Sequence, residues 1–256
     1  MKIGVQTFTV RRAQKKSIRE AYLPLLEMGI GNFEIARMEF NERNALAVKE
    51  LIDEFGIEVS AIQVKPKYIF GDVSGVSEFC RITGCRRAVI SMLPFGCILG
   101  SDARFYEFLG RLDGQAKIYA ERGIELGYHH HNWEYVKLAS GRTRMDELID
   151  RTEKIGFVHD TYWTARCGID PAVQIERFGD RLLGIHLRDL THEKSFLDVR
   201  AHDAAIGDGV IDFGRVFDAA ERVGCGYYVI EQKTDDPYGE IGKSYKKCKE
   251  IISGKE

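Results

Sequence analysis

The stretch IGFVHDTYWTARCGIDPAVQIERFGDRLLGIHLRD, residues 155–189, contains two short apolar runs with a helical segment between them. The runs at 155–160 and 182–189 are nearly continuous in apolar residues, as is typical of parallel strands that helices cover. The segment 170–179 has helical spacing, and Pro171 suits the first turn of a helix. The stretch therefore predicts a strand–helix–strand unit with parallel strands.

The same alternation extends over the whole chain. Strands are expected at 2–7, 32–36, 57–64, 87–92, 124–131, 155–160, 182–189 and 227–232. Helices are expected at 17–29, 44–56, 72–84, 103–123, 144–153, 170–179, 212–223 and in the tail up to 253. Eight such units without a linker predict an α/β fold, a (β/α)8 TIM barrel that forms a single domain over residues 1–256. A doubly wound sheet would give the same alternation.

The composition argues against several classes of function. Lys and Arg number 37 against 39 Asp and Glu, whereas a nucleic-acid-binding surface normally needs a basic excess. The six cysteines form no CxxC pair, so no zinc ribbon or redox pair is indicated. No apolar run is long enough for a membrane span, and no signal-peptide pattern begins the chain. We expect a cytoplasmic protein whose partner is a small molecule. The sequence does not decide whether the protein forms a homo-oligomer.

Ionisable residues end the four later strands. The fifth expected strand ends in His129 and His131, and the next three end in Asp160, His186 and Glu231. In a barrel, the C-terminal ends of all strands meet at one mouth, where active sites lie. One ionisable residue at a strand end is readily explained as a hydrogen-bonded core histidine or as an aspartate that caps the next turn. Four such groups buried together are costly unless they are paired or bind a metal. This set suits one divalent ion, Mn²⁺ before Co²⁺, Fe²⁺, Mg²⁺ or Zn²⁺.

Alternation along the fifth strand separates the three consecutive histidines. Because successive side chains point to opposite faces, His129 and His131 share one face, which is expected to line the mouth. His130 is expected to face the surrounding helices and to be structural. Glu134 follows the strand, on a loop that can fold back over the mouth.

Six short stretches resemble a known family. GYHHHNWEY (127–135), HDTYW (159–163), GIDP (168–171), GIHLRD (184–189), IGDGVIDF (206–213) and VIEQ (229–232) come in the order found in sugar phosphate isomerase/epimerase-like proteins. These proteins belong to the xylose-isomerase-like TIM-barrel superfamily, together with endonuclease four, hydroxypyruvate isomerase, tagatose-type epimerases and inosose dehydratase. The resemblance spans essentially the whole chain, and it identifies the superfamily rather than the reaction.

The resemblance implies metal ligands at Asp160, His186 and Glu231. Many members carry Glu where this chain has His129, so either His129 replaces that ligand or Glu134 supplies a carboxylate from the loop. Strands of the YHHH type are found in the inosose dehydratase branch. Trp163 stands where the endonuclease has a histidine for a second metal, which argues against a trinuclear phosphodiesterase site.

A metal that bridges a carbonyl and its neighbouring hydroxyl acidifies the C–H between them and stabilises an ene-diolate. Glu231, Glu134 and His131 are the candidate acid–base residues for moving the proton. Lys65 is either a cation that binds an anionic group or helps a hydroxide to leave, or a solvated loop lysine.

Three further residues are candidates for binding the substrate. Arg188 is expected to orient its hydroxyl groups, and Trp163 and Phe8 are candidates for an apolar wall. Core positions would look the same in sequence for both rings, and for Phe8 the core is favoured. The segment IGDGVIDFG (206–214) is expected to be a tight turn that holds the mouth loop rather than a phosphate cradle.

These residues predict a metal-dependent isomerase or epimerase of a small sugar, keto-sugar or sugar derivative. The alternative is a lyase, a dehydratase of an inosose-like or 3-keto-sugar substrate that begins with the same proton abstraction. An AP-endonuclease-like DNA repair protein and a non-catalytic sugar-binding barrel are the remaining alternatives.

Overall fold

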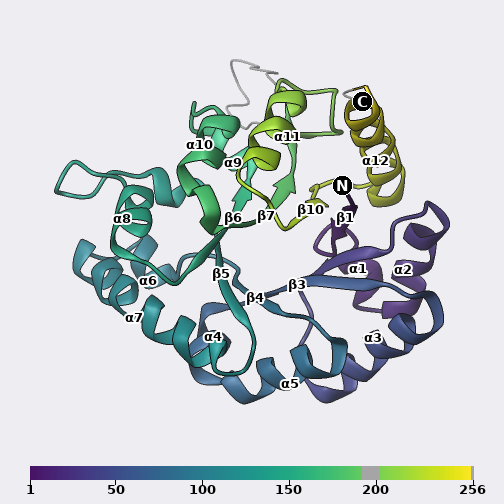
Figure 1. Ribbon diagram of the computed structural model, residues 1–256, viewed down its shortest axis with the longest axis horizontal. Helices are drawn as coiled ribbons and strands as arrows, with labels where there is room; N and C mark the ends of the chain where they lie inside the picture. The colour runs from purple at the N-terminus through teal and green to yellow at the C-terminus, as the bar shows by residue number, and fades with distance from the viewer. Residues whose placement is uncertain (192–201, 255–256) are drawn as a thin grey trace.

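The eight expected strands close into a parallel barrel, which excludes the doubly wound sheet (Figure 1). The computed structural model describes residues 1–191 and 202–254. Around the barrel the strands follow the order β1-β10-β7-β6-β5-β4-β3-β2. Their bounds are β1 (Ile3–Gln6), β2 (Asn32–Ile35), β3 (Glu58–Val64), β4 (Arg87–Ile90), β5 (Glu125–His129), β6 (Gly156–Asp160), β7 (Leu182–Leu187) and β10 (Tyr227–Ile230).

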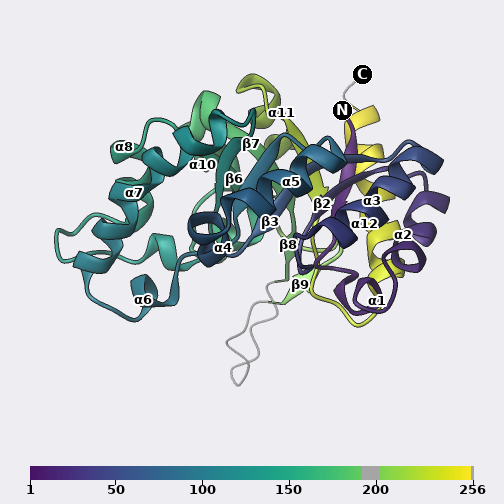
Figure 2. The same cartoon turned by 90° about the horizontal axis from the view of Figure 1, so that it is seen from below.

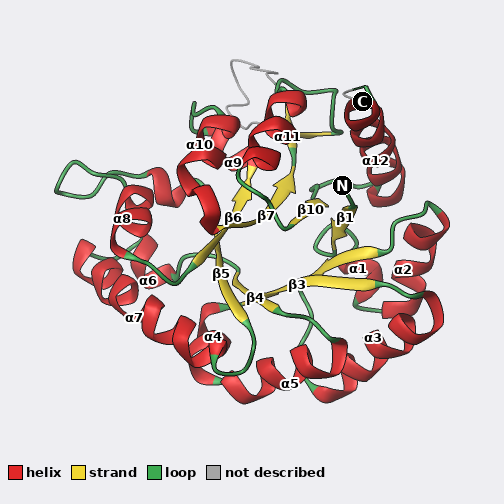
Figure 3. Cartoon of the chain, in the orientation of Figure 1, coloured by secondary structure: helices red, strands yellow, loops and turns green. Residues whose placement is uncertain are grey.

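Helices surround the strands in a ring, shown in red in Figure 3. All eight expected helices are present: α2 (Ile18–Glu27), α3 (Glu42–Phe55), α5 (Val73–Thr83), α7 (Asp102–Ala120), α8 (Arg144–Arg151), α10 (Pro171–Phe178), α11 (Phe213–Arg222) and α12 (Pro237–Ser253). Ser17 caps α2 by accepting a hydrogen bond from the Glu20 N–H, and Gly56 ends α3 with a φ of 67°. None of the helices in the described part of the chain has the length and apolarity needed to cross a membrane.

The connections contain short elements that the sequence did not predict. They are α1 (Arg11–Gln14), α4 (Pro66–Gly71), α6 (Phe95–Ile98), α9 (Thr161–Arg166), η1 (Trp133–Tyr135), η2 (Gly179–Arg181) and the antiparallel pair β8 (Asp189–Leu190) and β9 (Asp203–Ala204). Segments of two to six residues are too short to show a helical or strand period, which explains the omission. β8 and β9 project from the barrel on the side opposite to the N-terminus (Figure 2).

A small apolar cluster fills the barrel, separate from the larger core between strands and helices. Its members are Ala61, Val89, Val158, Leu183, Tyr227 and Val229. Two glycines make room for it: a Cβ on Gly156 would lie 2.4 Å from Leu183, and one on Gly184 would lie 2.3 Å from Tyr227. Because this cluster occupies the interior, the polar side chains at the strand ends lie over an apolar base.

Candidate metal centre

Four of the ionisable residues expected at the strand ends come together at the mouth. His129 and Asp160 end β5 and β6, His186 lies in β7, and Glu231 directly follows β10. One ligand atom from each of the four lies within 4.8 Å of the others. Glu231 is 7% exposed and the other three are at most 2% exposed. The closed barrel brings them together because its parallel strands all end at one rim.

The donor atoms of this group fit a metal ion. His129 Nε2, His186 Nδ1 and Glu231 Oε2 are buried and lack a hydrogen-bond partner among the described residues. His186 Nδ1 and Glu231 Oε2 are only 2.7 Å apart. Buried polar atoms that contact one another without a regular hydrogen bond are destabilising. Two imidazole nitrogens with two carboxylates form a ligand set that a divalent ion binds well.

Glu34 fixes the far side of the His186 ring. His186 Nε2 lies 2.8 Å from Glu34 Oε1, and the Tyr227 hydroxyl donates to Glu34 Oε2 at 2.6 Å. Donation of the Nε2 proton to Glu34 leaves Nδ1 to face the other ligands. This fully buried carboxylate was not predicted from the sequence, although an acidic residue inside the apolar run NFEIA was the available signal.

Replacing Glu34 with glutamine is expected to weaken metal binding by about 10- to 100-fold, because the ligand histidine loses its charged partner. Competition with a chelator measures the affinity. Glu58→Gln is the matched control, because the carboxylate of Glu58 is exposed and pairs with Lys2. Equal affinities in the two variants would show that Glu34 does not orient His186.

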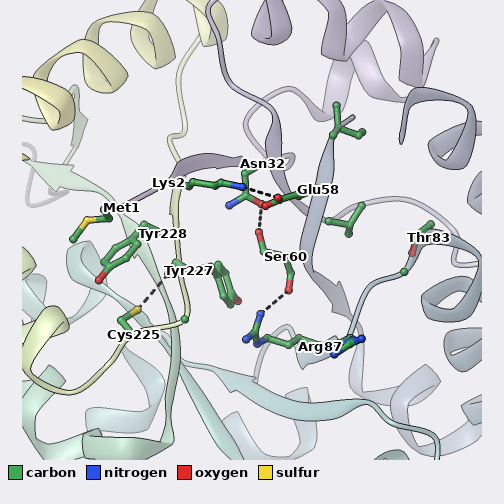
Figure 4. A pocket seen from close by; sticks show the side chains of 15 residues that line it. Met1, Lys2, Asn32, Glu58, Ser60, Thr83, Arg87, Cys225, Tyr227 and Tyr228 are labelled. Carbon is green, nitrogen blue, oxygen red and sulfur yellow. Dashed lines mark hydrogen bonds and ion pairs between the residues drawn. The ribbon is translucent and has the colours of Figure 1, made fainter. Parts of the chain in front are cut away.

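A cavity of about 530 Å³ lies at the N-terminal end of the barrel, away from the metal centre. Figure 4 shows that Lys2 pairs with Glu58 across it and that Arg87 reaches towards Ser60. Arg87 also lies 3.2 Å from Glu125. Glu58 and Glu125 thus match the charges of Lys2 and Arg87, and the residues of the candidate metal centre do not line this cavity.

Arg188 joins the carboxylates of the candidate centre. Its Nη1 lies 3.2 Å from Asp160 Oδ2 and 3.4 Å from Glu231 Oε1, and its Nε and Nη2 donate to Asp203 Oδ1. Burial alone would raise the pKa of both ligand carboxyls. Arg188 together with His186 and His129 outweighs burial, lowering the pKa of Glu231 to about 2 and holding that of Asp160 below its usual range. Both carboxylates are therefore ionised at neutral pH.

Asp160 also caps the next helix, because its Oδ1 accepts a hydrogen bond from the Trp163 N–H. The sequence presented capping and metal binding as alternatives, but capping uses only Oδ1 and leaves Oδ2 for the expected ligand role. Oδ1 caps the N-terminus of α9, while Oδ2 faces Arg188 and His129.

Asp189 organises the segment that returns from the mouth. Its buried carboxylate accepts hydrogen bonds from the N–H groups of Leu190, Gly207, Gly209 and Ile211. A Cβ on Gly209 would lie 2.2 Å from Asp189 Oδ1. The segment is therefore the expected tight turn, and its N–H groups bind a carboxylate of the protein itself rather than a phosphate.

The three consecutive histidines divide as alternation predicted. His130 faces α10, and its Nε2 lies 3.1 Å from His159 Nδ1. The ring of His131 lies 4.7 Å from that of His129 and 5.3 Å from that of Trp163. His131 Nδ1 and Trp163 Nε1 are buried and, within residues 1–191 and 202–254, make no hydrogen bond. Both atoms are thus available to a bound molecule.

The structure does not bring Glu134 into the group of four. Its fully buried carboxylate accepts hydrogen bonds from the Tyr128 hydroxyl and the His131 N–H. Tyr128 precedes His129 in β5, so its side chain points away from the barrel interior and holds Glu134 on the outer side. His129 rather than Glu134 is the fourth member.

Two other candidates lie at the rim. Lys65 is exposed at the start of α4, and its role stays a prediction. Phe8, half-buried after β1, lies outside the hydrophobic core.

Residues 24–251 match the family model of the xylose isomerase-like TIM barrel. The chain belongs to this family. The inosose dehydratase of Geobacillus kaustophilus is 23% identical to it over 86% of this chain and 83% of its own length. A sugar phosphate isomerase/epimerase from Parabacteroides distasonis has a TM-score of 0.77 at 17% identity, with 96% of each chain covered. The IOLI protein with a binding zinc atom has a TM-score of 0.72 at 14% identity, with 99% of each chain covered.

In this xylose isomerase-like barrel, metal binding is expected to release one proton. Burial alone would lower the pKa of His186, but Glu34 and Glu231 outweigh it and raise the pKa to about 10. Below that pH a metal must displace the proton from Nδ1, so its affinity should rise about tenfold per pH unit between about pH 6 and pH 8. Calorimetry in buffers of different ionisation enthalpy counts the released protons. A pH-independent affinity would contradict this role of His186.

Proposed function

We propose that the protein is a divalent-metal-dependent isomerase or epimerase of a small sugar, keto-sugar or sugar derivative. The observation that carries this proposal is the convergence of buried ligand atoms from His129, His186 and Glu231, beside Asp160, at the barrel mouth. A divalent ion held there supplies Lewis acidity, which acidifies a C–H next to a carbonyl. Mn²⁺ is the proposed ion, because two carboxylates favour a hard ion and two imidazoles disfavour Mg²⁺; the zinc atom of the IOLI protein makes Zn²⁺ the main competitor.

The proposed proton transfer uses groups on two sides of the mouth. Glu231 is ionised at neutral pH and accepts the proton from the substrate carbon. His131 is the second acid–base group: burial lowers its pKa to about 3, so its ring is neutral and can exchange a proton with a hydroxyl. Trp163 Nε1 donates to the substrate and Arg188 orients its hydroxyl groups. Lys65 at the rim is proposed to bind a more distant polar group.

A dehydratase is the second candidate function. It requires the same first proton transfer, followed by loss of a hydroxide from the next carbon. The similarity to the inosose dehydratase of Geobacillus kaustophilus favours this candidate. In it, the proton that Glu231 accepts would pass to the departing hydroxide, which leaves as water. The net charge of −2 and Trp163 weigh against an AP-endonuclease.

Proton NMR in D₂O tests the proposal with Mn²⁺-loaded protein and a panel of keto-sugars that includes 3-keto-D-glucose and an inosose. We expect deuterium to enter at the carbon next to the carbonyl, with an isomer or epimer as the product. An unsaturated product that has lost water would establish the dehydratase instead. Absence of exchange in every member of the panel, with metal bound, would show a non-catalytic barrel.

A further inference from the structure

Two arginine side chains cover the ring of Phe8 at the rim of the mouth. The guanidinium carbon of Arg11 lies 4.0 Å from the ring centroid, and that of Arg37 lies 5.0 Å from it. Arg11 Nη1 also donates to the Phe8 carbonyl oxygen at 2.7 Å. Neither guanidinium forms an ion pair with a carboxylate in residues 1–191 and 202–254. Burial, with repulsion from Arg12 and Arg37, lowers the pKa of Arg11. Like charges therefore gather here without a carboxylate in direct contact with them.

Hydrogen bonds attach this rim to the candidate metal centre. Thr9 Oγ1 accepts a hydrogen bond at 3.0 Å from the N–H of Gln232, the residue after Glu231. Thr9 directly follows Phe8, so the ring and its two guanidinium groups lie beside the proposed ligand. Attraction from Glu231 opposes the effect of burial and raises the pKa of Arg11, which agrees with a position near that carboxylate.

The backbone of Arg37 has an unusual conformation. In the described part of the chain, Arg37 is the one non-glycine residue with a positive φ, at 58°. L residues rarely adopt this conformation unless surrounding structure imposes it. The Ala36 N–H donates to Thr7 Oγ1 at 2.9 Å, which fixes the residue before Arg37 to the loop that carries Phe8. The two arginines are thus held together by the ring and by the loop.

We propose that Arg11 and Arg37 form an anion subsite beside the metal centre, which binds a carboxylate or phosphate group of the substrate. Guanidinium groups bind these anions through paired N–H donors, and an aromatic face orients the guanidinium plane. An anion would supply the direct counter-charge that no described carboxylate provides at this position. The inference rests on the proposed function and narrows its substrate to a sugar acid or a sugar phosphate.

Calorimetric measurement of the binding of three probes to Mn²⁺-loaded protein tests the subsite. The probes are D-glucuronate, D-glucose 6-phosphate and neutral D-glucose. At least one anionic probe is expected to bind about tenfold or more tightly than D-glucose, and the preferred one identifies the anion as carboxylate or phosphate. In Arg37→Ala and Arg11→Met this preference should disappear.

Arg12→Ala is the matched control, because it removes the same charge from the neighbouring position. Arg12 is exposed, and its guanidinium group lies 3.6 Å from the carboxylate of Asp235. The variant should retain the preference. The inference is overturned if neither anion binds more tightly than D-glucose, or if Arg12→Ala loses as much as Arg37→Ala. A protein that fails to bind Mn²⁺ would instead refute the proposed function, and the same comparison with metal-free protein would still decide the subsite.

Discussion

Replacing Glu231 with glutamine is expected to slow proton exchange by about 10³-fold, the size of effect typical for loss of an acid–base group. Glutamine has the same shape, so the fold should persist. The change removes a negative charge from the ligand set and removes the group that accepts the proton. It also takes away one of the carboxylates that neutralise Arg188. The rate of deuterium uptake at saturating metal and substrate measures the effect.

Glu58→Gln is the control for this experiment, because it makes the same chemical change at the opposite end of the barrel. Its exchange rate should equal that of the wild type. If Glu231→Gln binds metal and exchanges protons at the wild-type rate, neither proposed role of Glu231 is correct.

Replacing Asp189 with asparagine is expected to lower the free energy of unfolding by about 3 kcal/mol, because a buried anion with several N–H partners is replaced by a neutral group. The four N–H groups around it belong to the turn that follows β9 and to Leu190. The amide has only one acceptor oxygen, and its NH₂ group would face N–H groups. Urea denaturation followed by circular dichroism measures the change.

Asp208→Asn is the matched control within the same turn. Asp208 is exposed and pairs with Lys243, so its replacement should change the free energy of unfolding by less than about 1 kcal/mol. Equal losses in the two variants would mean that the Asp189 carboxylate does not hold the turn.

The candidate centre could be predicted from sequence to the extent that it depends on strand ends. Asp160, His186 and Glu231 each end an apolar run, and a parallel barrel must gather such ends at one rim. Glu34 escaped prediction because it ends no run, and its role depends on the facing His186, which is distant in sequence. Arg11 and Arg37 escaped because the ring between them lies on a loop, where the chain has no period.

The choice between His129 and Glu134 shows that the alternation of side chains along a strand predicts their direction only within the strand. Inside β5 the two-residue period places His129 inward and Tyr128 outward. Glu134 lies beyond the strand, and its direction is set by the hydroxyl of Tyr128 and the N–H of His131. These contacts depend on the path of the backbone through η1. A segment of three residues is too short for its conformation to be predicted from sequence.

The central claim is that His129, Asp160, His186 and Glu231 bind one metal ion. Titration of the metal-free protein with Mn²⁺, in which electron paramagnetic resonance measures the free ion, tests it most directly. The wild type is expected to bind one ion per chain at neutral pH. His129→Ala should bind it at least about tenfold more weakly, because it loses one of four ligands, and Glu134→Gln should bind it like the wild type. A wild-type protein that binds no ion, or a His129→Ala variant that binds it with unchanged affinity, would contradict the assignment of the centre to His129, Asp160, His186 and Glu231.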